Sequence, residues 1–134
     1  MELKCRRIIE KDLDVISKWM EDYGGEMPSL DFLPNNGTGG FVVANDTGII
    51  AAMWLWFTNS KTAIPAMVMA DKKYRDKDRH DALELLMDFT TQFAKDAGCE
   101  FAFAWAKPGV LLEFYEQLGY KKDSKESFEL IKKL

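Results

Sequence analysis

Residues 112–120 read Leu112-Glu113-Phe114-Tyr115-Glu116-Gln117-Leu118-Gly119-Tyr120. Apolar and polar residues are spaced there as on an amphipathic helix, and a glycine follows, as it commonly does just past a helix end. Pro108 stands just upstream, where the first turn of a helix tolerates proline. The pattern predicts a short helix over Val110–Leu118. On a short helix of this kind, Tyr115 can be a packed aromatic residue.

Two further elements lie directly upstream of this helix. Asp81–Ala97 is the strongest helical pattern in the chain, with one apolar face and Gly98 after its end. Phe101–Ala106 is an apolar run that predicts a buried strand. Downstream of residues 112–120, Phe128–Ile131 is a candidate for a final strand.

The first half of the chain predicts one helix and several strands. The helix begins at Asp12 and ends before Gly24. Turn residues at 45–48 join two β-favouring runs, so those two strands should pair antiparallel. Pro65 lies inside the last of the strands and cannot donate to a ladder, so an edge, a bulge or a local splay is expected there. The predicted strands cover residues 3–9, 41–44, 49–57 and 62–70.

The elements follow the order β-α-β-β-β-α-β-α-β. This order predicts a mixed α/β fold in which the long helix crosses over between two strands that are candidates for parallel pairing. The chain has 134 residues, of which 47% are hydrophobic. That is enough to build one core, so a single domain over residues 1–134 is expected.

The composition argues against several classes of protein. Eighteen basic and 22 acidic residues give a net charge of -4, which disfavours nucleic-acid binding by general phosphate attraction. Cys5, Cys99 and His80 are too few and too scattered for a disulfide framework or a metal site, so no metal is expected. The N-terminus has no apolar signal core, and no apolar run approaches the ~20 residues that span a bilayer. We therefore expect a cytoplasmic protein without a membrane partner.

Residues 112–120, in this order of elements, resemble the GNAT superfamily of N-acetyltransferases, whose penultimate helix commonly reads F/L-Y-E-x-L-G-F/Y. Tyr74-Arg75, followed by the long helix, is placed like the family's coenzyme motif R/Q-x-x-G-x-G/A. The resemblance covers nearly the whole chain. It implies the GNAT acyltransferase fold and transfer of an acetyl group from acetyl-CoA to a primary amine on a small molecule or a protein.

The resemblance also implies which residues contact the coenzyme. In the family, bare backbone N–H groups at the helix N-terminus hold the pyrophosphate, and a strand edge aligns the pantetheine. This chain has Asp76, Asp78 and His80 where the family favours small residues, and acidic or bulky side chains there oppose acetyl-CoA binding. The implied coenzyme-binding residues are Val68, Met69, Ala70, Arg75, Lys77, Arg79 and His80.

Two interpretations of this loop are open. Its basic side chains, Lys72 and Lys73 among them, can clamp the phosphates in place of a bare glycine loop. Alternatively, Asp78 is the N-cap of the long helix, with Asp81 three residues on. In that arrangement the acidic side chains satisfy the N–H groups that a pyrophosphate would need.

Other residues are candidates for chemistry. Tyr115 occupies the position of a tyrosine that in the family often protonates the departing thiolate, which implies a general acid. Glu26 and Asp31 either attract the amine and relay its proton or are ordinary solvated loop carboxylates. Trp54 and Trp56 share one face of a strand, and they either floor an acceptor pocket or belong to the core.

More than one function therefore stays open. The first is a GNAT-like N-acetyltransferase. The second is a GNAT fold without catalysis that serves as a binding or structural accessory protein, because small, glycine-poor chains of this kind resemble accessory proteins of bacteriophages or mobile elements. A third is an unrelated α+β interaction domain. The oligomeric state is also open, with a homodimer as one option.

Overall fold

The computed structural model describes residues 2–75 and 77–134. The chain forms two compact units, the first ending at Ala104 and the second spanning Trp105–Leu134. The single domain expected over residues 1–134 stays a prediction. Within the described ranges, no helix combines the length and the apolar character needed to cross a membrane.

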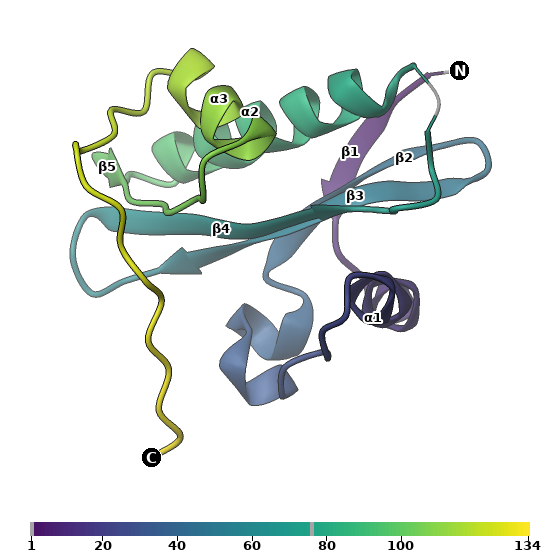
Figure 1. The fold of residues 1–134 in the computed structure, drawn as a ribbon, viewed down its shortest axis with the longest axis horizontal. Coiled ribbons are helices and arrows are strands. Elements are labelled where there is room, and N and C mark those ends of the chain that lie inside the picture. The colour runs from purple at the N-terminus through teal and green to yellow at the C-terminus, as the bar shows by residue number, and fades with distance from the viewer. Residues whose placement is uncertain (1, 76) are drawn as a thin grey trace. The chain divides into compact units, whose positions relative to one another are not determined.

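A five-stranded sheet forms the centre of the first unit (Figure 1). The strands lie in their chain order, and all neighbours are antiparallel except β4 and β5, which are parallel. The helix α2 (Arg79–Asp96) connects this parallel pair, so the predicted crossover is confirmed, although α2 begins at Arg79 rather than Asp81. The strands are β1 (Lys4–Arg7), β2 (Gly40–Asn45), β3 (Gly48–Phe57), β4 (Thr62–Ala70) and β5 (Phe101–Ala102).

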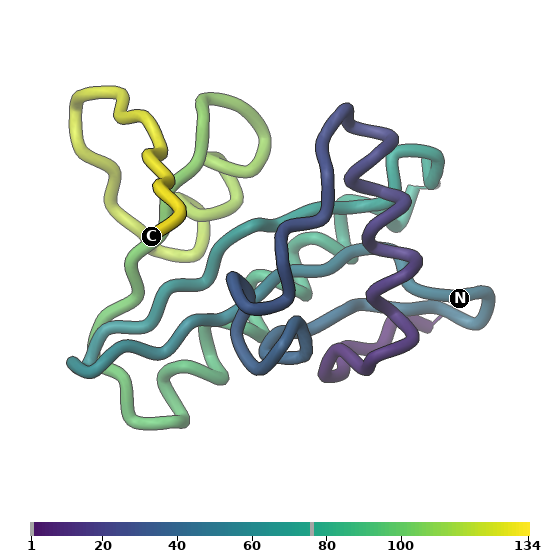
Figure 2. Tube along the Cα trace, turned by 90° about the horizontal axis from the view of Figure 1, so that it is seen from below, coloured from purple at the N-terminus to yellow at the C-terminus, as the bar shows by residue number. Residues whose placement is uncertain are grey.

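Helices cover both faces of this sheet. α2 lies over one face, and α1 (Asp12–Asp22) lies over the other (Figure 1). The segment that follows α1 holds two short 3-10 turns, η1 (Leu30–Phe32) and η2 (Pro34–Gly37), and it lies beside α1 over the same face (Figure 2). Because β3 is covered on both faces, its sequence reads as a nearly continuous apolar run.

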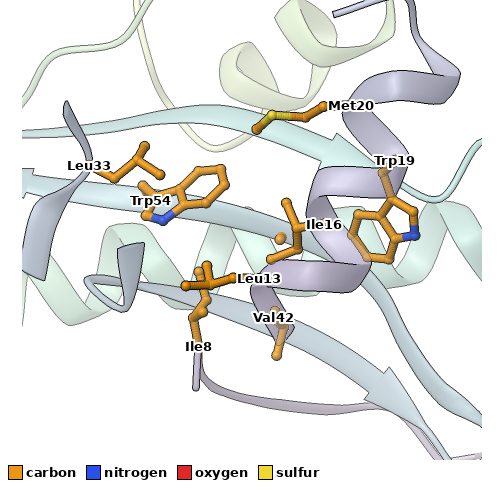
Figure 3. Packing of buried hydrophobic residues seen from close by; sticks show 9 residues of the cluster. Ile8, Leu13, Ile16, Trp19, Met20, Leu33, Val42 and Trp54 are labelled. Atoms are coloured by element: carbon orange, nitrogen blue, oxygen red, sulfur yellow. The ribbon is translucent and has the colours of Figure 1, made fainter. Parts of the chain in front are cut away.

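A cluster of buried side chains fills the space between α1 and the sheet (Figure 3). Trp54 is fully buried in it, and its indole Nε1 donates to the carbonyl of Gly37 at 2.8 Å. This bond satisfies the one polar atom of the ring and ties η2 to β3. The interpretation of Trp54 as a core residue is therefore confirmed. The buried members are Ile8, Leu13, Ile16, Trp19, Met20, Leu33, Val42, Ala52 and Trp54.

An ion pair fixes the start of α1 against β1. Arg6 donates to both carboxylate oxygens of Asp12, at 2.7 and 3.0 Å, and the backbone N–H of Ile9 donates to the same carboxylate at 2.9 Å. Burial by itself would raise the pKa of Asp12, but these hydrogen bonds and the Arg6 charge outweigh it and lower the pKa. Asp12 is only 4% exposed, so these bonds replace the water that its charge has lost.

Two strand predictions are wrong in extent or existence. Of the strand predicted over residues 101–106, only Phe101–Ala102 pairs, and the Phe101 side chain is 67% exposed rather than buried. Among the described residues β5 pairs with β4 alone, so no second ladder extends it. Phe128–Ile131, in the second unit, is not a strand, and its large apolar side chains are exposed. A strand of this length needs a ladder partner and an apolar surface to cover, and the structure supplies neither there.

The second unit contains α3 (Val110–Gln117), which confirms the helix predicted from residues 112–120. Gly119 has φ 96°, in the left-handed region, and the N–H groups of Gly119 and Tyr120 bond back to the carbonyls of Glu116 and Tyr115, each at 3.0 Å. This is the Schellman arrangement of a helix end. It brings the Tyr120 ring edge-on to the Tyr115 ring, with centroids 5.0 Å apart. The predicted helix end thus also shapes the surroundings of Tyr115.

Candidate functional site

Strand β4 carries a bulge in the middle of the predicted coenzyme-binding residues. Met67 and Val68 together stand opposite the single residue Met53 of β3. Met67 has φ 59°, a left-handed conformation that costs a non-glycine residue roughly 1–2 kcal/mol. Its side chain packs against the cluster under α1, which offsets this cost. The bulge re-aims the backbone of β4 at Val68. On either side of the bulge, Trp54 pairs with Ala66 and Ala52 pairs with Met69.

Beyond its first residues β4 parts from β5. Only Thr62 and Ala63 are in register with β5, and the N–H of Phe103 adds one more bond to the carbonyl of Ala63, at 2.8 Å. From Ile64 to Ala70, no described strand lies along this side of β4. We call this stretch the open edge. Pro65 lies in it, so the expectation of an edge, bulge or splay at this proline is confirmed.

Ala70 presents its backbone to the open edge. The N–H of Asp71 donates to the carbonyl of Ile50 on β3, at 2.9 Å, and the carbonyl of a trans peptide points opposite to its N–H. The carbonyl of Ala70 therefore points away from β3. By the alternation of an antiparallel ladder, Met69 turns its backbone groups toward β3 instead. Of these two predicted coenzyme contacts, Ala70 is the one whose backbone faces the open edge.

The Ala70 carbonyl already has a partner within the chain. The hydroxyl of Tyr23, just past the end of α1, donates to it at 2.9 Å. Lys72 places its Nζ 5.6 Å from the centroid of the Tyr23 ring, and Arg79 donates to the Tyr23 hydroxyl at 3.3 Å. A ligand that used the Ala70 carbonyl would have to displace the Tyr23 hydroxyl.

Arg79 binds the loop rather than pointing to solvent. Its guanidinium donates to the carbonyl of Tyr74 at 3.1 Å and to the carbonyl of Asp71. These bonds close the loop between β4 and α2. The same guanidinium N–H groups were predicted to bind the coenzyme phosphates. A phosphate would therefore compete with the carbonyls of the loop for Arg79.

Asp78 stands at the N-cap position of α2, as predicted, but its side chain makes no capping bond. Its carboxylate accepts instead from the hydroxyl of Tyr74, which in turn accepts from the side-chain amide of Asn45, at 3.2 Å. The prediction that Asp78 satisfies the first N–H groups of the helix with its side chain is therefore wrong. The hydroxyl of Tyr74 binds the carboxylate in place of the helix N–H groups, and through Asn45 it anchors Asp78 to the β2–β3 turn.

The other predicted phosphate contacts are exposed. Arg75 and Lys77 extend into solvent, and His80 contacts Glu84, with Nδ1 and Oε2 3.8 Å apart. His80, Asp81 and Glu84 hold one potential ligand atom each within 4.8 Å of one another, but all three are exposed, as surface groups on a helix often are. The predicted role of Asp76 lies outside the described residues.

Tyr115, the predicted general acid, belongs to α3 and is buried. It is 4% exposed, and burial, followed by the neighbouring Tyr120, raises the pKa of its phenol. A raised pKa makes a phenol a weaker proton donor. This environment matches the interpretation of Tyr115 as a packed aromatic residue, and the role of general acid stays a prediction.

The remaining candidates differ in their surroundings. Glu26 and Asp31 are exposed. Trp56 lies on the same face of β3 as Trp54, as predicted. Its ring packs edge-on to Phe32, with centroids 6.3 Å apart, and it lines a cavity of about 310 Å³.

Two residues near this site were not marked by the sequence. Tyr23 is 47 positions from Ala70, and Asn45 is 29 positions from Tyr74. Tyr23 sits between the last helical residue and Gly24, an ordinary position for a helix end. Asn45 belongs to a hairpin turn, where asparagine is common. No local pattern distinguishes either residue from a structural one.

Comparison with known proteins gives similarity in structure but not in sequence. No protein-family model and no curated protein sequence matches this chain. The ribosomal-protein-S18-alanine N-acetyltransferase from Escherichia coli matches with a TM-score of 0.72 at 13% identity, over 92% of this chain and 80% of that one. An aminoglycoside N-acetyltransferase in complex with CoA matches with 0.68 at 11%, over 97% and 95%. A transcriptional regulator from Bacillus halodurans C-125 matches with 0.72 at 18%, over 97% and 99%.

At these low identities the similarity concerns the fold. It agrees with the features already described, a mixed sheet with one parallel pair, a crossover helix, and a bulged strand that parts from its parallel neighbour. This chain therefore has the α/β fold of the GNAT N-acetyltransferases.

Proposed function

We propose that this chain is an N-acyltransferase that moves the acetyl group of acetyl-CoA to a primary amine. The observation that carries the proposal is the open edge of β4, where the bulge and the separation from β5 leave backbone groups without a neighbouring strand. An extended molecule with amide groups can add to such an edge as a strand does. The pantetheine arm of acetyl-CoA is a molecule of this kind. An aminoglycoside N-acetyltransferase of the same fold holds CoA, which supports the proposal.

The proposed contacts at the edge are the backbone groups of Val68 and Ala70, with Met69 between them turned to β3. Binding there has a cost, because the hydroxyl of Tyr23 must leave the carbonyl of Ala70 or share it. A carbonyl oxygen has two lone pairs, so sharing is chemically allowed. The coenzyme therefore competes with a contact inside the protein.

The phosphates are proposed to lie over the loop between β4 and α2. Lys72, Arg75 and Lys77 are exposed and can reach a phosphate, but Lys72 must first release the carbonyl of Asp22, to which its Nζ donates at 3.3 Å. His80 and Arg79 complete the proposed set, Arg79 only after releasing a loop carbonyl. The carboxylate of Asp78 opposes phosphate binding, since a like charge at ~5 Å costs on the order of 3 kcal/mol at an effective dielectric near 20, and less where water screens it.

The chemistry is a direct transfer. The neutral amine attacks the thioester carbonyl, a C–N bond forms and the C–S bond breaks. The nitrogen gives up one of its two protons to solvent to become an amide, and the sulfur leaves as a thiolate that takes up one proton. The amine first loses a proton to solvent, by way of Glu26 or Asp31 if these loop carboxylates serve as the relay. Tyr115 is the proposed donor to the thiolate. Because burial raises the pKa of this phenol, the transfer becomes favourable only if substrate binding brings solvent or charge to it.

A titration followed by two-dimensional amide NMR tests the coenzyme site. Acetyl-CoA should shift the amide signals of residues 66–70 and of the loop 71–80. Adenosine 3′,5′-bisphosphate, which lacks the pantetheine arm, should shift the loop signals and leave residues 66–70 unchanged. If millimolar acetyl-CoA leaves residues 66–70 unmoved, the coenzyme does not use the open edge and the proposal is wrong. Release of free thiol with a panel of amines, including aminoglycosides and N-terminal alanine peptides, then tests catalysis.

A second candidate is a GNAT fold that binds a partner without catalysis, as an accessory protein of the kind found in bacteriophages. Two contacts favour it, because each occupies a group that acetyl-CoA would use: Tyr23 with Ala70, and Arg79 with the loop carbonyls. The Asp78 carboxylate, which Tyr74 holds at the start of α2, disfavours the phosphates as well. A protein described as a transcriptional regulator has a similar structure. Purified protein that neither carries CoA nor binds acetyl-CoA would support this candidate. Light scattering after gel filtration tests whether the chain forms a homodimer.

A further inference from the structure

The cavity that Trp56 lines belongs to the first unit and lies at the rim of the sheet, beside β1, β2 and β3. It encloses about 310 Å³, at the low end of the roughly 300–1,000 Å³ typical of small-molecule sites. The open edge lies beyond β4, on the other side of β3 from β1 and β2, and strands are spaced about 4.8 Å apart. This rim cavity is therefore separate from the proposed coenzyme site.

The cavity arises because two paired strands end at different points. The register of β2 with β3 stops at Gly40 opposite Trp54, with one further bond from the N–H of Leu55 to the carbonyl of Gly39, whereas β3 continues to Phe57. The last residues of β3 thus extend past β2 and leave a recess. Asn35, from η2, borders the recess on one side.

The lining of the rim cavity combines aromatic side chains with polar groups, among them Asn35 and the backbone at Gly39 and Gly40. Phe41 on β2 packs against Phe93 of α2, with ring centroids 4.9 Å apart. Trp56 and Phe57 of β3 add apolar surface, and the Phe57 side chain is 53% exposed. Large aromatic surfaces of this kind bind flat apolar rings well.

Among the residues that line the cavity, the charged one is Arg7 of β1, which carries a positive charge. Its guanidinium carbon lies 5.7 Å from the ring centroid of Phe41 and 5.6 Å from that of Phe93. Within the described part of the chain no carboxylate lies within ion-pair distance of Arg7, unlike Arg6, which is paired with Asp12. The two rings therefore hold the planar guanidinium at the mouth of the cavity with its N–H donors available, and a guanidinium recognises a carboxylate with two parallel hydrogen bonds.

We propose that the rim cavity binds a small carboxylate that carries a single apolar ring. The ring lies against Phe57 and Phe93, which are not fully buried, and the carboxylate pairs with Arg7. Neither acetyl-CoA nor the open edge takes part, so the test of this site does not depend on whether the acetyltransferase proposal is correct.

The test uses two probes that differ in charge, benzoate and benzyl alcohol, each titrated into the full chain and followed by amide NMR. Benzoate should shift the signals of residues 39–41 and 55–57 and bind at millimolar concentration, with benzyl alcohol roughly tenfold weaker or more. Arg7→Met should weaken benzoate binding by about the same factor and leave benzyl alcohol within about twofold. Arg7→Lys, which keeps the charge but loses the planar pair of donors, should fall between the two.

Lys4→Met is the matched control. It removes one positive charge from the same strand, at a position three residues away on the opposite face of β1. Benzoate binding should stay unchanged in this variant. The assignment is overturned if benzoate leaves residues 39–41 and 55–57 unshifted, if both probes bind equally well, or if Lys4→Met weakens benzoate as much as Arg7→Met. Should Arg7→Met not fold, the two probes on the unmodified chain and on Arg7→Lys still decide the question.

Discussion

Replacing Asp12 by asparagine removes the charge that fixes α1 to β1 while keeping the size of the side chain. The carboxylate is almost fully buried and accepts three hydrogen bonds, two from Arg6 and one from the N–H of Ile9. Breaking a fully buried pair costs about 3–5 kcal/mol. Arg6 is 40% exposed, so water can take over part of its hydration, and the amide oxygen of asparagine can still accept from Ile9. We therefore expect a loss of about 2–3 kcal/mol at neutral pH.

The assay is urea unfolding followed by circular dichroism, at neutral pH and near pH 3, for the unmodified chain, Asp12→Asn and the control Asp14→Asn. Asp14 is exposed in the same first turn, so its variant reports the general effect of losing an acidic residue there. The pKa of Asp12 is lowered by folding. Its contribution is therefore present above the unfolded value of about 3.9 and is lost as the pH falls through the folded value.

The difference between the unmodified chain and Asp12→Asn should therefore shrink at acid pH. Equal stability of Asp12→Asn and Asp14→Asn at neutral pH would refute the reasoning. So would a difference that persists unchanged when the carboxylate is protonated.

Three further predictions concern the proposed function. Asp78→Asn removes a charge beside the proposed phosphate site and should tighten acetyl-CoA binding, measured by calorimetry, roughly five-fold or more. The control Asp88→Asn, farther along the same helix, should leave the affinity unchanged. Weaker binding in Asp78→Asn would show that the carboxylate belongs to a ligand site. Tyr23→Phe frees the carbonyl of Ala70 and should also tighten acetyl-CoA binding several-fold, and a decrease would show that the hydroxyl assists the coenzyme. Tyr115→Phe should lower turnover about 10²-fold with little change in acetyl-CoA affinity if the phenol is the acid, whereas an unchanged rate removes it from the mechanism.

The candidate site could be predicted in part. The sequence predicted an edge, a bulge or a splay at Pro65, because proline withholds a donor from any ladder regardless of its neighbours, and the structure places Pro65 on the open edge. It did not predict the bulge at Met67 and Val68. It also placed Asp78 at the start of α2. It did not predict the partner of Asp78, because the choice between a helix N–H and the Tyr74 hydroxyl depends on where the β2–β3 turn holds Tyr74.

The sequence by itself determined the helices, the hairpin and the order of the elements along the chain, because spacing of apolar residues and glycine at helix ends act over only a few neighbouring residues. Only the tertiary structure decided the length of β5, the exposed state of Phe128–Ile131 and the contact of Tyr23 with Ala70. A strand exists only where another strand completes its ladder, and a hydroxyl bonds whichever acceptor packing brings within reach. Both depend on residues tens of positions away, and no local pattern records them.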